Sequence, residues 1–155
     1  MIEIKSLYRS YGNGTELRTI IDDININIER GKFTAILGRN GSGKSTLARH
    51  INAILSPQKG SVKVDGMDTR DSELIYDIRS KAGMVFQNPE SQAVASIVED
   101  DTAFAPENLG LPPEEIQRRV ENALSAAGIS HLSKRSINSL SGGQKQLTAI
   151  AGILA

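Results

Sequence analysis

The residues from Gly38 to Thr46 form a complete glycine-rich phosphate-binding loop, and this feature constrains the chain more than any other. They match the pattern G-x-x-x-x-G-K-[ST] without a substitution. The loop glycines let the backbone turn tightly and direct N–H groups toward phosphate oxygens. We expect Lys44 to contact the β- and γ-phosphates of ATP, and the Ser45 hydroxyl to be a ligand for Mg²⁺. The predicted ATP-binding residues are Gly38, Arg39, Asn40, Gly41, Ser42, Gly43, Lys44, Ser45 and Thr46.

The residues around the loop fit the same interpretation. Phe33–Leu37 is an apolar run that predicts a buried strand leading into the loop. Apolar residues then recur at helical spacing, which places the loop at a helix N-terminus, where free N–H groups favour anions. A glycine-rich turn that matches by accident is the alternative, and this strand–loop–helix order argues against it. The apolar positions of the predicted helix are Leu47, Ala48, Ile51, Ile54 and Leu55, and Pro57 is expected to end it.

Composition narrows the class of protein. The chain has 155 residues, 39% of them hydrophobic and 23% charged, as in a single soluble globular domain. Its 18 Lys and Arg balance 18 Asp and Glu, so no basic surface predicts a nucleic-acid partner. It has no cysteine, which excludes disulfides and zinc–thiolate sites. No apolar stretch approaches the ~20 residues that cross a bilayer, and the N-terminus lacks a signal-peptide pattern.

The pattern of strands and helices changes near Gln87. Before it, strands predominate: Ile24–Ile28 alternates strictly, as in a sheet with one wet face, and a turn is expected at Gly12–Gly14. After it, Asn88–Pro89 is expected to end the strand, and residues from about 90 to 138 are predicted to be helical with loops. Further elements are predicted as a strand over 61–66, a helix over 74–82, a buried strand over 83–86 and a helix from Pro113 to Gly128.

A second motif, Leu140–Gln144, reads LSGGQ. Taken alone, it is a serine-capped helix start with free N–H groups, which again suits an anion. Taken with the phosphate loop, it resembles the signature of the ATP-binding-cassette (ABC) family. The residues that the resemblance assigns to the γ-phosphate of a partner subunit's ATP are Ser141, Gly142, Gly143 and Gln144.

The resemblance covers the whole chain and implies its fold class. It implies an α/β fold: a P-loop (RecA-like) core with an antiparallel β portion and a helical insertion, ending before the Walker B strand. The chain would be the N-terminal part of one nucleotide-binding domain. Its parts would be the β portion and P-loop core over 1–87, the helical subdomain over about 88–140 and the signature helix over 141–155.

The resemblance also assigns roles to two residues outside the motifs. Gln87 would contact Mg²⁺ or the attacking water and report to the transmembrane partner; a polar residue that merely caps a strand is the alternative. Tyr11 would stack on adenine, with Tyr8 as its rival and a tyrosine unconnected with nucleotide as the third interpretation.

The sequence around Gln87 indicates a subfamily. Val85–Gln92, Val98–Leu111 and the residues after Gln144 resemble the ATPases of energy-coupling factor transporters, which import vitamins or transition-metal ions. Asn88–Pro89 favours the first of the two paralogous ATPase subunits. The implied partners are a second ABC ATPase subunit, identical or homologous, a transmembrane coupling subunit and a substrate-binding membrane component. Two ATPase subunits would meet head to tail at the cytoplasmic face of the membrane, and no nucleic acid is implied.

The chain departs from the family pattern after the signature. The family continues into a strand ending in Asp-Glu, a second Asp and a switch histidine, none of which occurs before Ala155. Glu99–Asp101 is a weak substitute and is more consistent with an acidic helix face, and His131 also precedes the signature. Leu147 stands where the family usually has arginine.

Without the next strand, Phe33–Leu37 would expose unpaired backbone groups. We therefore expect a fragment of a longer protein, not hydrolytic alone, or an oligomer that covers that edge.

Two other functions are compatible with the residues. One is a non-hydrolytic nucleotide-binding module that docks onto a partner. The other is a soluble ABC ATPase that acts on nucleic acid or the ribosome and is not linked to transport; the zero net charge counts against it.

Overall fold

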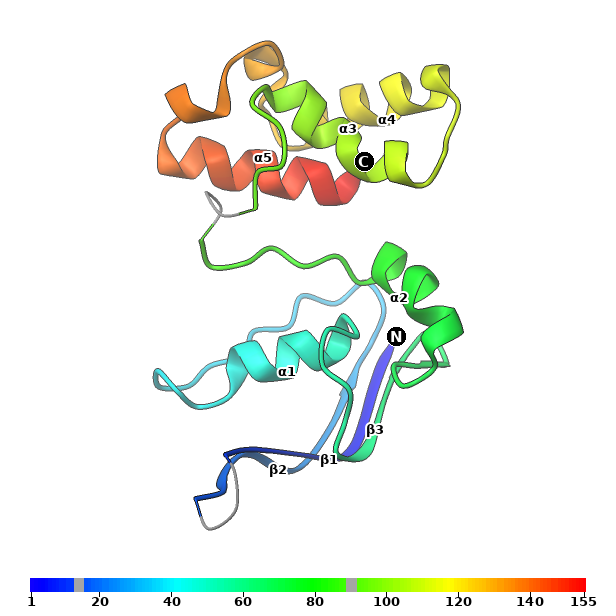
Figure 1. Cartoon of the computed structure of the whole chain (residues 1–155), viewed down its shortest axis with the longest axis vertical. Coiled ribbons are helices and arrows are strands. Elements are labelled where there is room, and N and C mark those ends of the chain that lie inside the picture. The colour runs from blue at the N-terminus through cyan, green and yellow to red at the C-terminus, as the bar shows by residue number, and fades with distance from the viewer. Residues whose placement is uncertain (13–15, 89–91) are drawn as a thin grey trace. The chain divides into compact units, whose positions relative to one another are not determined.

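The chain folds as two units, Met1–Gly83 and Met84–Ala155. Both are seen in the computed structural model, which describes residues 1–12, 16–88 and 92–155 (Figure 1). The turn expected at Gly12–Gly14 and the break expected at Asn88–Pro89 lie partly outside the described residues. The first unit contains β1 (Ile2–Tyr11), β2 (Arg18–Ile28), α1 (Lys44–Ile51), β3 (Lys59–Val64), β4 (Met67–Asp68), η1 (Ser72–Leu74) and α2 (Ile75–Lys81).

An antiparallel sheet in the order β2-β1-β3-β4 forms the base of the first unit. In the central strand, Ile4 pairs with Ile26 on one side and with Val62 on the other. Because side chains alternate along a strand, Ile24, Ile26 and Ile28 of β2 turn toward one face and are half-buried, whereas Asn25 and Asn27 are exposed, as the sequence predicts. Helix α1 covers this face, and its Leu47 joins the buried cluster (Figure 1). The cluster comprises Ile4, Leu7, Ile21, Leu47 and Val62.

Helix α1 is shorter than the sequence predicts, because it ends at Ile51 and not at Pro57. The cause is local: Ala53 has a left-handed backbone (φ 54°), and the N–H groups of Ile54 and Leu55 both donate to the carbonyl of Arg49 at 2.9 and 3.0 Å. These bonds close the helix end in the manner of a C-terminal capping turn.

Two predicted buried strands are not formed. Phe33–Leu37 has no strand hydrogen bonding, and Phe33 and Leu37 are 97% and 90% exposed. Residues 83–86 are also irregular. The physical reason is the same for both: every strand of the observed sheet lies within β1–β4, so no strand in the described part of the chain pairs with either segment. An unpaired strand would leave its backbone groups without strand partners, so both segments remain irregular.

Three helices make up the core of the second unit: α3 (Val98–Asn108), α4 (Pro113–Ala126) and α5 (Gly142–Leu154), with the short turns η3 (Ser130–Leu132) and η4 (Ile137–Ser139). Helix α4 begins at a proline followed by two glutamates and ends before Gly128, whose φ is 72°, as predicted. The helices enclose one cluster: Val98, Val120, Ala123, Leu124, Ile129, Leu132, Ile137, Leu140 and Ala151.

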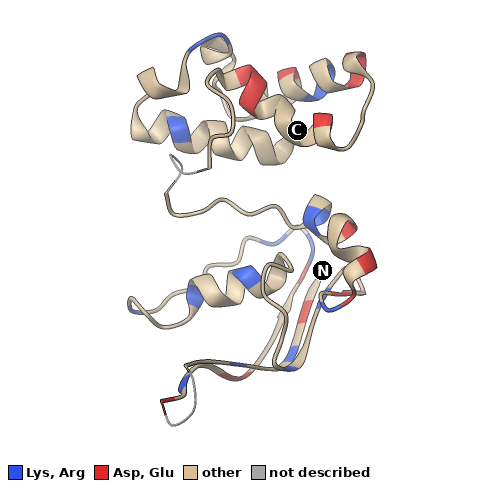
Figure 2. Cartoon of the chain, in the orientation of Figure 1, with Lys and Arg blue, Asp and Glu red and all other residues tan. Residues whose placement is uncertain are grey.

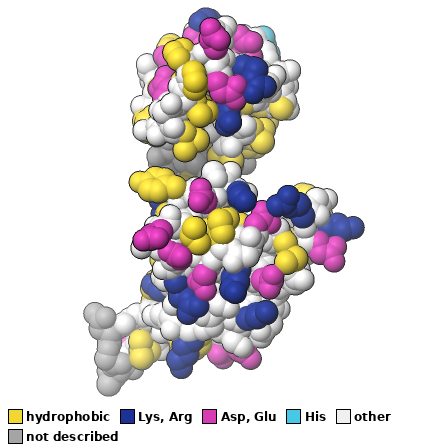
Figure 3. Space-filling model, turned by 90° about the vertical axis from the view of Figure 1, so that its right-hand side faces the viewer, with side chains coloured by type: hydrophobic (Ala, Val, Ile, Leu, Met, Phe, Trp, Pro, Cys, Tyr) yellow, Lys and Arg dark blue, Asp and Glu magenta, His cyan; other side chains and the backbone are white. Residues whose placement is uncertain are grey.

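Acidic and basic side chains are spread through both units, with Glu99–Asp101 as an acidic run at the start of α3 (Figure 2). The face drawn in Figure 3 likewise shows charges of both signs next to one another. This distribution agrees with the balanced composition. None of the helices in the described residues has the length and apolar character needed to span a bilayer.

Candidate nucleotide-binding site

The predicted phosphate loop ends at the N-terminus of α1. The helix starts at Lys44, and Gly43 precedes it with a left-handed backbone (φ 90°) and no side-chain cap. A Cβ at Gly38 would lie 2.6 Å from the Ser42 hydroxyl oxygen, so the two ends of the loop lie close together. The result is a compact turn whose uncapped helix N–H groups are available to an anion.

Lys44 is folded back over this loop. Its ammonium donates to the carbonyl oxygens of Gly38 at 2.8 Å and Arg39 at 2.9 Å. The charge is therefore held at the loop by exchangeable bonds to exposed carbonyls. Phosphate oxygens carry full negative charge and are stronger acceptors than carbonyls, so they can replace these partners. Ser45 follows in the first turn of α1 with an exposed side chain.

His50 anchors α1 from inside the first unit. Its ring is fully buried, and Nδ1–H donates to the carbonyl of Thr46 at 2.7 Å. The other ring nitrogen, Nε2, is buried without a hydrogen-bond partner. Burial lowers the pKa of His50, and the Arg9 charge lowers it further, while the Thr46 carbonyl acts in the opposite direction. The histidine is thus a neutral core residue of the loop helix.

We expect acid to destabilise the protein through His50. Because its native pKa is below the unfolded value, the unfolded state binds the proton first, and stability falls as the pH drops through about 6.5. Urea unfolding of the full-length protein between about pH 7.5 and 5.5 measures this slope. His50→Gln should reduce it, whereas His131→Gln, at an exposed position, should not. An unchanged slope in His50→Gln would contradict the prediction.

The two candidate tyrosines for the adenine base both lie on β1 but differ in solvent exposure and in hydrogen bonding. Tyr8 is half-buried and its hydroxyl is 3.1 Å from that of Thr19. Tyr11, at the end of the strand, is 40% exposed. The sheet register pairs Tyr11 with Arg18, two residues along β2 from Ile20, which Gly43 approaches closely. Tyr11 is therefore near the loop and accessible, and its stacking on adenine stays a prediction.

The second motif caps helix α5. The Ser141 hydroxyl accepts from the N–H of Gln144 at 3.4 Å, and the Gln144 side chain accepts from the N–H of Ser141 at 2.9 Å. This reciprocal pair is a capping box. The serine-capped helix start predicted from the sequence is therefore present, with Ser141, Gly142 and Gly143 exposed to solvent.

The two glycines of this motif have no packing role in the chain. A Cβ at Gly142 or Gly143 would meet no described atom within 4 Å, and neither residue has a positive φ. Alanine would favour the helix more than glycine does. The glycines therefore leave open space above the helix start, a feature that this chain's own fold does not require.

Gln87 belongs to the second unit and is exposed. The residues before it are held by Gln92, whose side-chain oxygen accepts from the N–H of Phe86 at 2.8 Å and whose amide donates to Met84 at 3.4 Å. This clamp was not predicted, although the glutamine is part of the segment that carries the family resemblance. The roles of Gln87 toward Mg²⁺ and water stay predictions.

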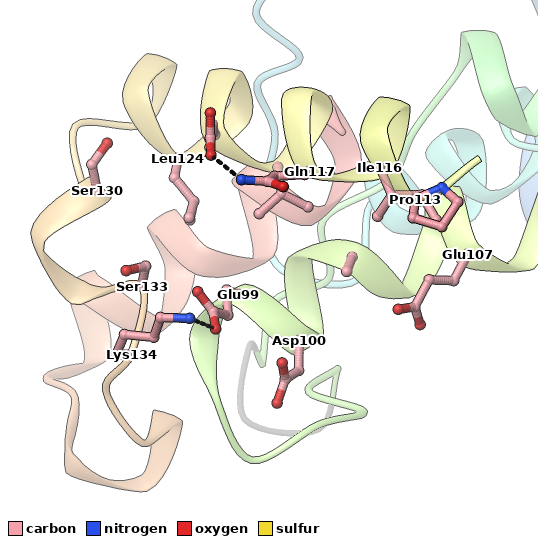
Figure 4. Close-up of a pocket in the computed structure, with 13 residues that line it drawn as sticks. Glu99, Asp100, Glu107, Pro113, Ile116, Gln117, Leu124, Ser130, Ser133 and Lys134 are labelled. Atoms are coloured by element: carbon pink, nitrogen blue, oxygen red, sulfur yellow. Dashed lines mark hydrogen bonds and ion pairs between the residues drawn. The ribbon is translucent and has the colours of Figure 1, made fainter. Parts of the chain in front are cut away.

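Glu99–Asp101 lies in the first turn of α3, so the prediction of an acidic helix face in the helical insertion is confirmed. Glu99 pairs with Lys134, and Asp101 accepts from the N–H groups of Val94 and Ala95 at 2.7 and 3.0 Å. Glu99 and Asp100 border a groove of about 800 Å³ between α3 and α4 (Figure 4). Its lining is separate from both the phosphate loop and the signature motif.

Comparison with known proteins decides the family. The family model described as ABC transporter matches residues 21–155. The chain belongs to the ABC transporter family. Within it, the chain is 58% identical over 136 residues to the energy-coupling factor transporter ATP-binding protein EcfA1 of Caldanaerobacter subterraneus subsp. tengcongensis, covering 88% of this chain and 49% of that protein. This bears out the resemblance to energy-coupling factor ATPases.

Solved ABC structures match the whole chain. The structure of cbiO1 from Clostridium perfringens, part of the ABC transporter complex cbiONQ, has a TM-score of 0.86 and 40% identity, covering 99% of this chain and 60% of that one. The ATP-binding cassette MJ0796, a dimer bound to ADP and Pi, has a TM-score of 0.85 and 30% identity, covering 100% and 69%. The predicted ABC fold class, α/β with an antiparallel portion and a helical insertion, is confirmed.

The chain spans about half the length of the EcfA1 relative that it matches. ATPase activity is a property of the ABC family, and nucleotide binding is implied by membership. The 155 residues contain the phosphate loop and the signature but not the carboxylates that come after the signature in the family pattern.

Proposed function

We propose that the full-length protein is the ATP-binding subunit of an energy-coupling factor importer for a vitamin or a transition-metal ion. It would bind and hydrolyse Mg-ATP between two head-to-tail ATPase subunits, attached to a transmembrane coupling subunit and a substrate-binding membrane component at the cytoplasmic face of the membrane. The EcfA1 and cbiO1 relatives support this subunit type.

The open glycines of the signature are the observation that carries the proposal. Gly142 and Gly143 lie at an uncrowded helix start where the fold itself would accept alanine. Free N–H groups and the positive end of the helix dipole favour an anion at this place. In a head-to-tail dimer, that anion would be the γ-phosphate of ATP held by Lys44 of the other subunit. The MJ0796 cassette, a dimer bound to ADP and Pi, is a similar protein that assembles in pairs.

The residues present fit a magnesium ion. No group of three or more His, Asp or Glu side chains in the described residues could hold a metal by itself. Mg²⁺ at a phosphate site needs only one or two protein oxygens, since phosphates and water complete its shell. The exposed Ser45 hydroxyl in the first turn of α1 would be one of these ligands. The family resemblance assigns the Gln87 side chain as the other. The ion would neutralise charge on the phosphate oxygens during transfer.

The chain's own residues would act by position and charge. The uncapped N–H groups at the start of α1 would bind phosphate oxygens, and Lys44 would give up its loop carbonyls for the β- and γ-phosphates. Gln87 would orient the attacking water. Tyr11 would stack on the base. The general base would lie in the half of the protein beyond the signature, together with the strand that pairs with Phe33–Leu37.

A purification and turnover experiment tests the proposal. The full-length protein, isolated from membranes in mild detergent, should bring membrane proteins with it and hydrolyse ATP only with Mg²⁺. Activity per subunit should rise with subunit concentration, because the site needs two subunits. ATP binding without hydrolysis in any assembled state would favour the non-hydrolytic module. Hydrolysis stimulated by RNA or DNA, without a membrane partner, would favour the soluble ATPase instead.

A further inference from the structure

Two tyrosines of β1 each carry a cation over one ring face. The guanidinium carbon of Arg9 lies 4.8 Å from the centre of the Tyr11 ring, and the Lys59 ammonium lies 5.1 Å from the centre of the Tyr8 ring. Both distances are within the range of cation–π attraction. The pairs differ in surroundings: Tyr8 is tied to Thr19, whereas Tyr11 keeps 40% of its surface exposed. Of these two pairs, the Tyr8 pair is constrained and the Tyr11 ring is accessible.

Arg9 is held by the segment that follows the loop helix. Its Nη1 donates to the carbonyl of Ser56 at 3.4 Å, and its Nε is buried without a hydrogen-bond partner. The guanidinium is therefore fixed between the end of the α1 segment and the Tyr11 ring. A flat guanidinium can stack on an aromatic ring while its edge donates hydrogen bonds, which a lysine ammonium cannot do equally well.

Tyr11 is also close to the phosphate loop within the same unit. Gly43 packs against β2, since a Cβ placed on it would lie 3.0 Å from the carbonyl oxygen of Ile20. Arg18, the register partner of Tyr11, is two residues away along β2, roughly 7 Å at the rise of a strand. A base attached to phosphates at the loop would therefore find the Tyr11 ring beside it.

We propose that Arg9 is a positioning residue for the adenine base. Its guanidinium covers one face of the Tyr11 ring and holds the ring in place, so that the opposite face stacks on adenine. The contribution is made through Tyr11 and concerns only the base, because the phosphates are bound by the loop. This inference rests on the proposed ATP binding and adds the residue that orients the base platform.

Binding measurements on the full-length protein separate base from phosphate recognition. We expect Arg9→Ala and Tyr11→Ala each to weaken Mg-ATP binding about three- to tenfold. Neither should change the affinity for Mg-tripolyphosphate, which lacks the base. The double variant should bind ATP no more weakly than Tyr11→Ala, and Arg9→Lys should be intermediate. Lys59→Ala removes the matched cation over Tyr8 and should leave both affinities unchanged.

The outcomes distinguish this inference from the function on which it rests. If the unmodified protein does not bind ATP, the proposed function fails. If it binds ATP and Tyr11→Ala weakens binding but Arg9→Ala does not, only the role of Arg9 fails. If Arg9→Ala weakens ATP and tripolyphosphate equally, Arg9 is structural and the inference is wrong. Equal ATP affinity in all variants would also overturn the proposal that adenine stacks on Tyr11.

Discussion

Ser141→Arg is expected to abolish ATP turnover by the full-length protein while ATP affinity changes by less than about threefold. The side chain caps an exposed helix start in the second unit, whereas the predicted ATP-binding loop belongs to the first. In the proposed dimer, the long cation would fill the space left open by Gly142 and Gly143 and prevent the partner's γ-phosphate from reaching the N–H groups. Losing such stabilisation costs on the order of a hundredfold or more in rate. Steady-state hydrolysis and equilibrium ATP binding measure the two effects.

Two further variants show whether the loss arises from the interface or from the fold. Ser139→Arg places the same side chain at an exposed site two residues earlier and should keep turnover. Gly143→Ala adds one methyl group that meets no described atom within 4 Å and should preserve or raise the melting temperature, yet reduce turnover. Full turnover in Ser141→Arg would show that the signature does not act on a partner's nucleotide.

The elements that local patterns specify were predictable from the sequence. Helix α4 has its proline and acids at the start, an apolar face and a glycine past its end, so its bounds follow from residues in the helix and next to it. The alternation in β2 likewise indicates a half-buried strand. The helix after the phosphate loop was predicted in place but too long, because the left-handed Ala53 that ends it carries no glycine or proline signal.

The strands expected at Phe33–Leu37 and over residues 83–86 were predicted wrongly for a non-local reason. Phe33–Leu37 has the apolar composition of a buried strand, but a strand exists only when another strand pairs with it. The apolar composition of a segment shows that it could be buried, whereas strand pairing depends on residues elsewhere in the chain. The 97% exposure of Phe33 is the consequence in a chain whose observed sheet contains only β1 to β4.

The candidate site also has features that the sequence predicts and features that it does not. The phosphate loop and the signature are contiguous motifs whose chemistry follows from residue type, so both were found from the sequence. The contacts of Arg9 with Tyr11 and Ser56, and of Gln92 with Phe86, join residues that only the fold or a loop brings together. No spacing rule identifies them, since each depends on a side-chain direction.

Lys44→Ala is expected to weaken Mg-ATP binding to the full-length protein on the order of a hundredfold and to eliminate measurable hydrolysis. In the proposed site the Lys44 ammonium would face the phosphates, and hydrogen bonds between charged groups are stronger than neutral ones. The fold should tolerate the change, because the two carbonyls that Lys44 now contacts are on exposed residues and water can replace it. Isothermal titration with Mg-ATP and thermal unfolding test both parts.

Arg49→Ala is the matched control for charge, because it removes one cation from the exposed surface of the same helix without touching the loop. Its ATP affinity should stay within about twofold of the unmodified protein, as expected for a screened surface charge. Equal losses in the two variants would mean that the helix acts only through its general positive field. A loss confined to Lys44→Ala places the effect at the phosphates, because of the two cations only the Lys44 ammonium bonds to the loop.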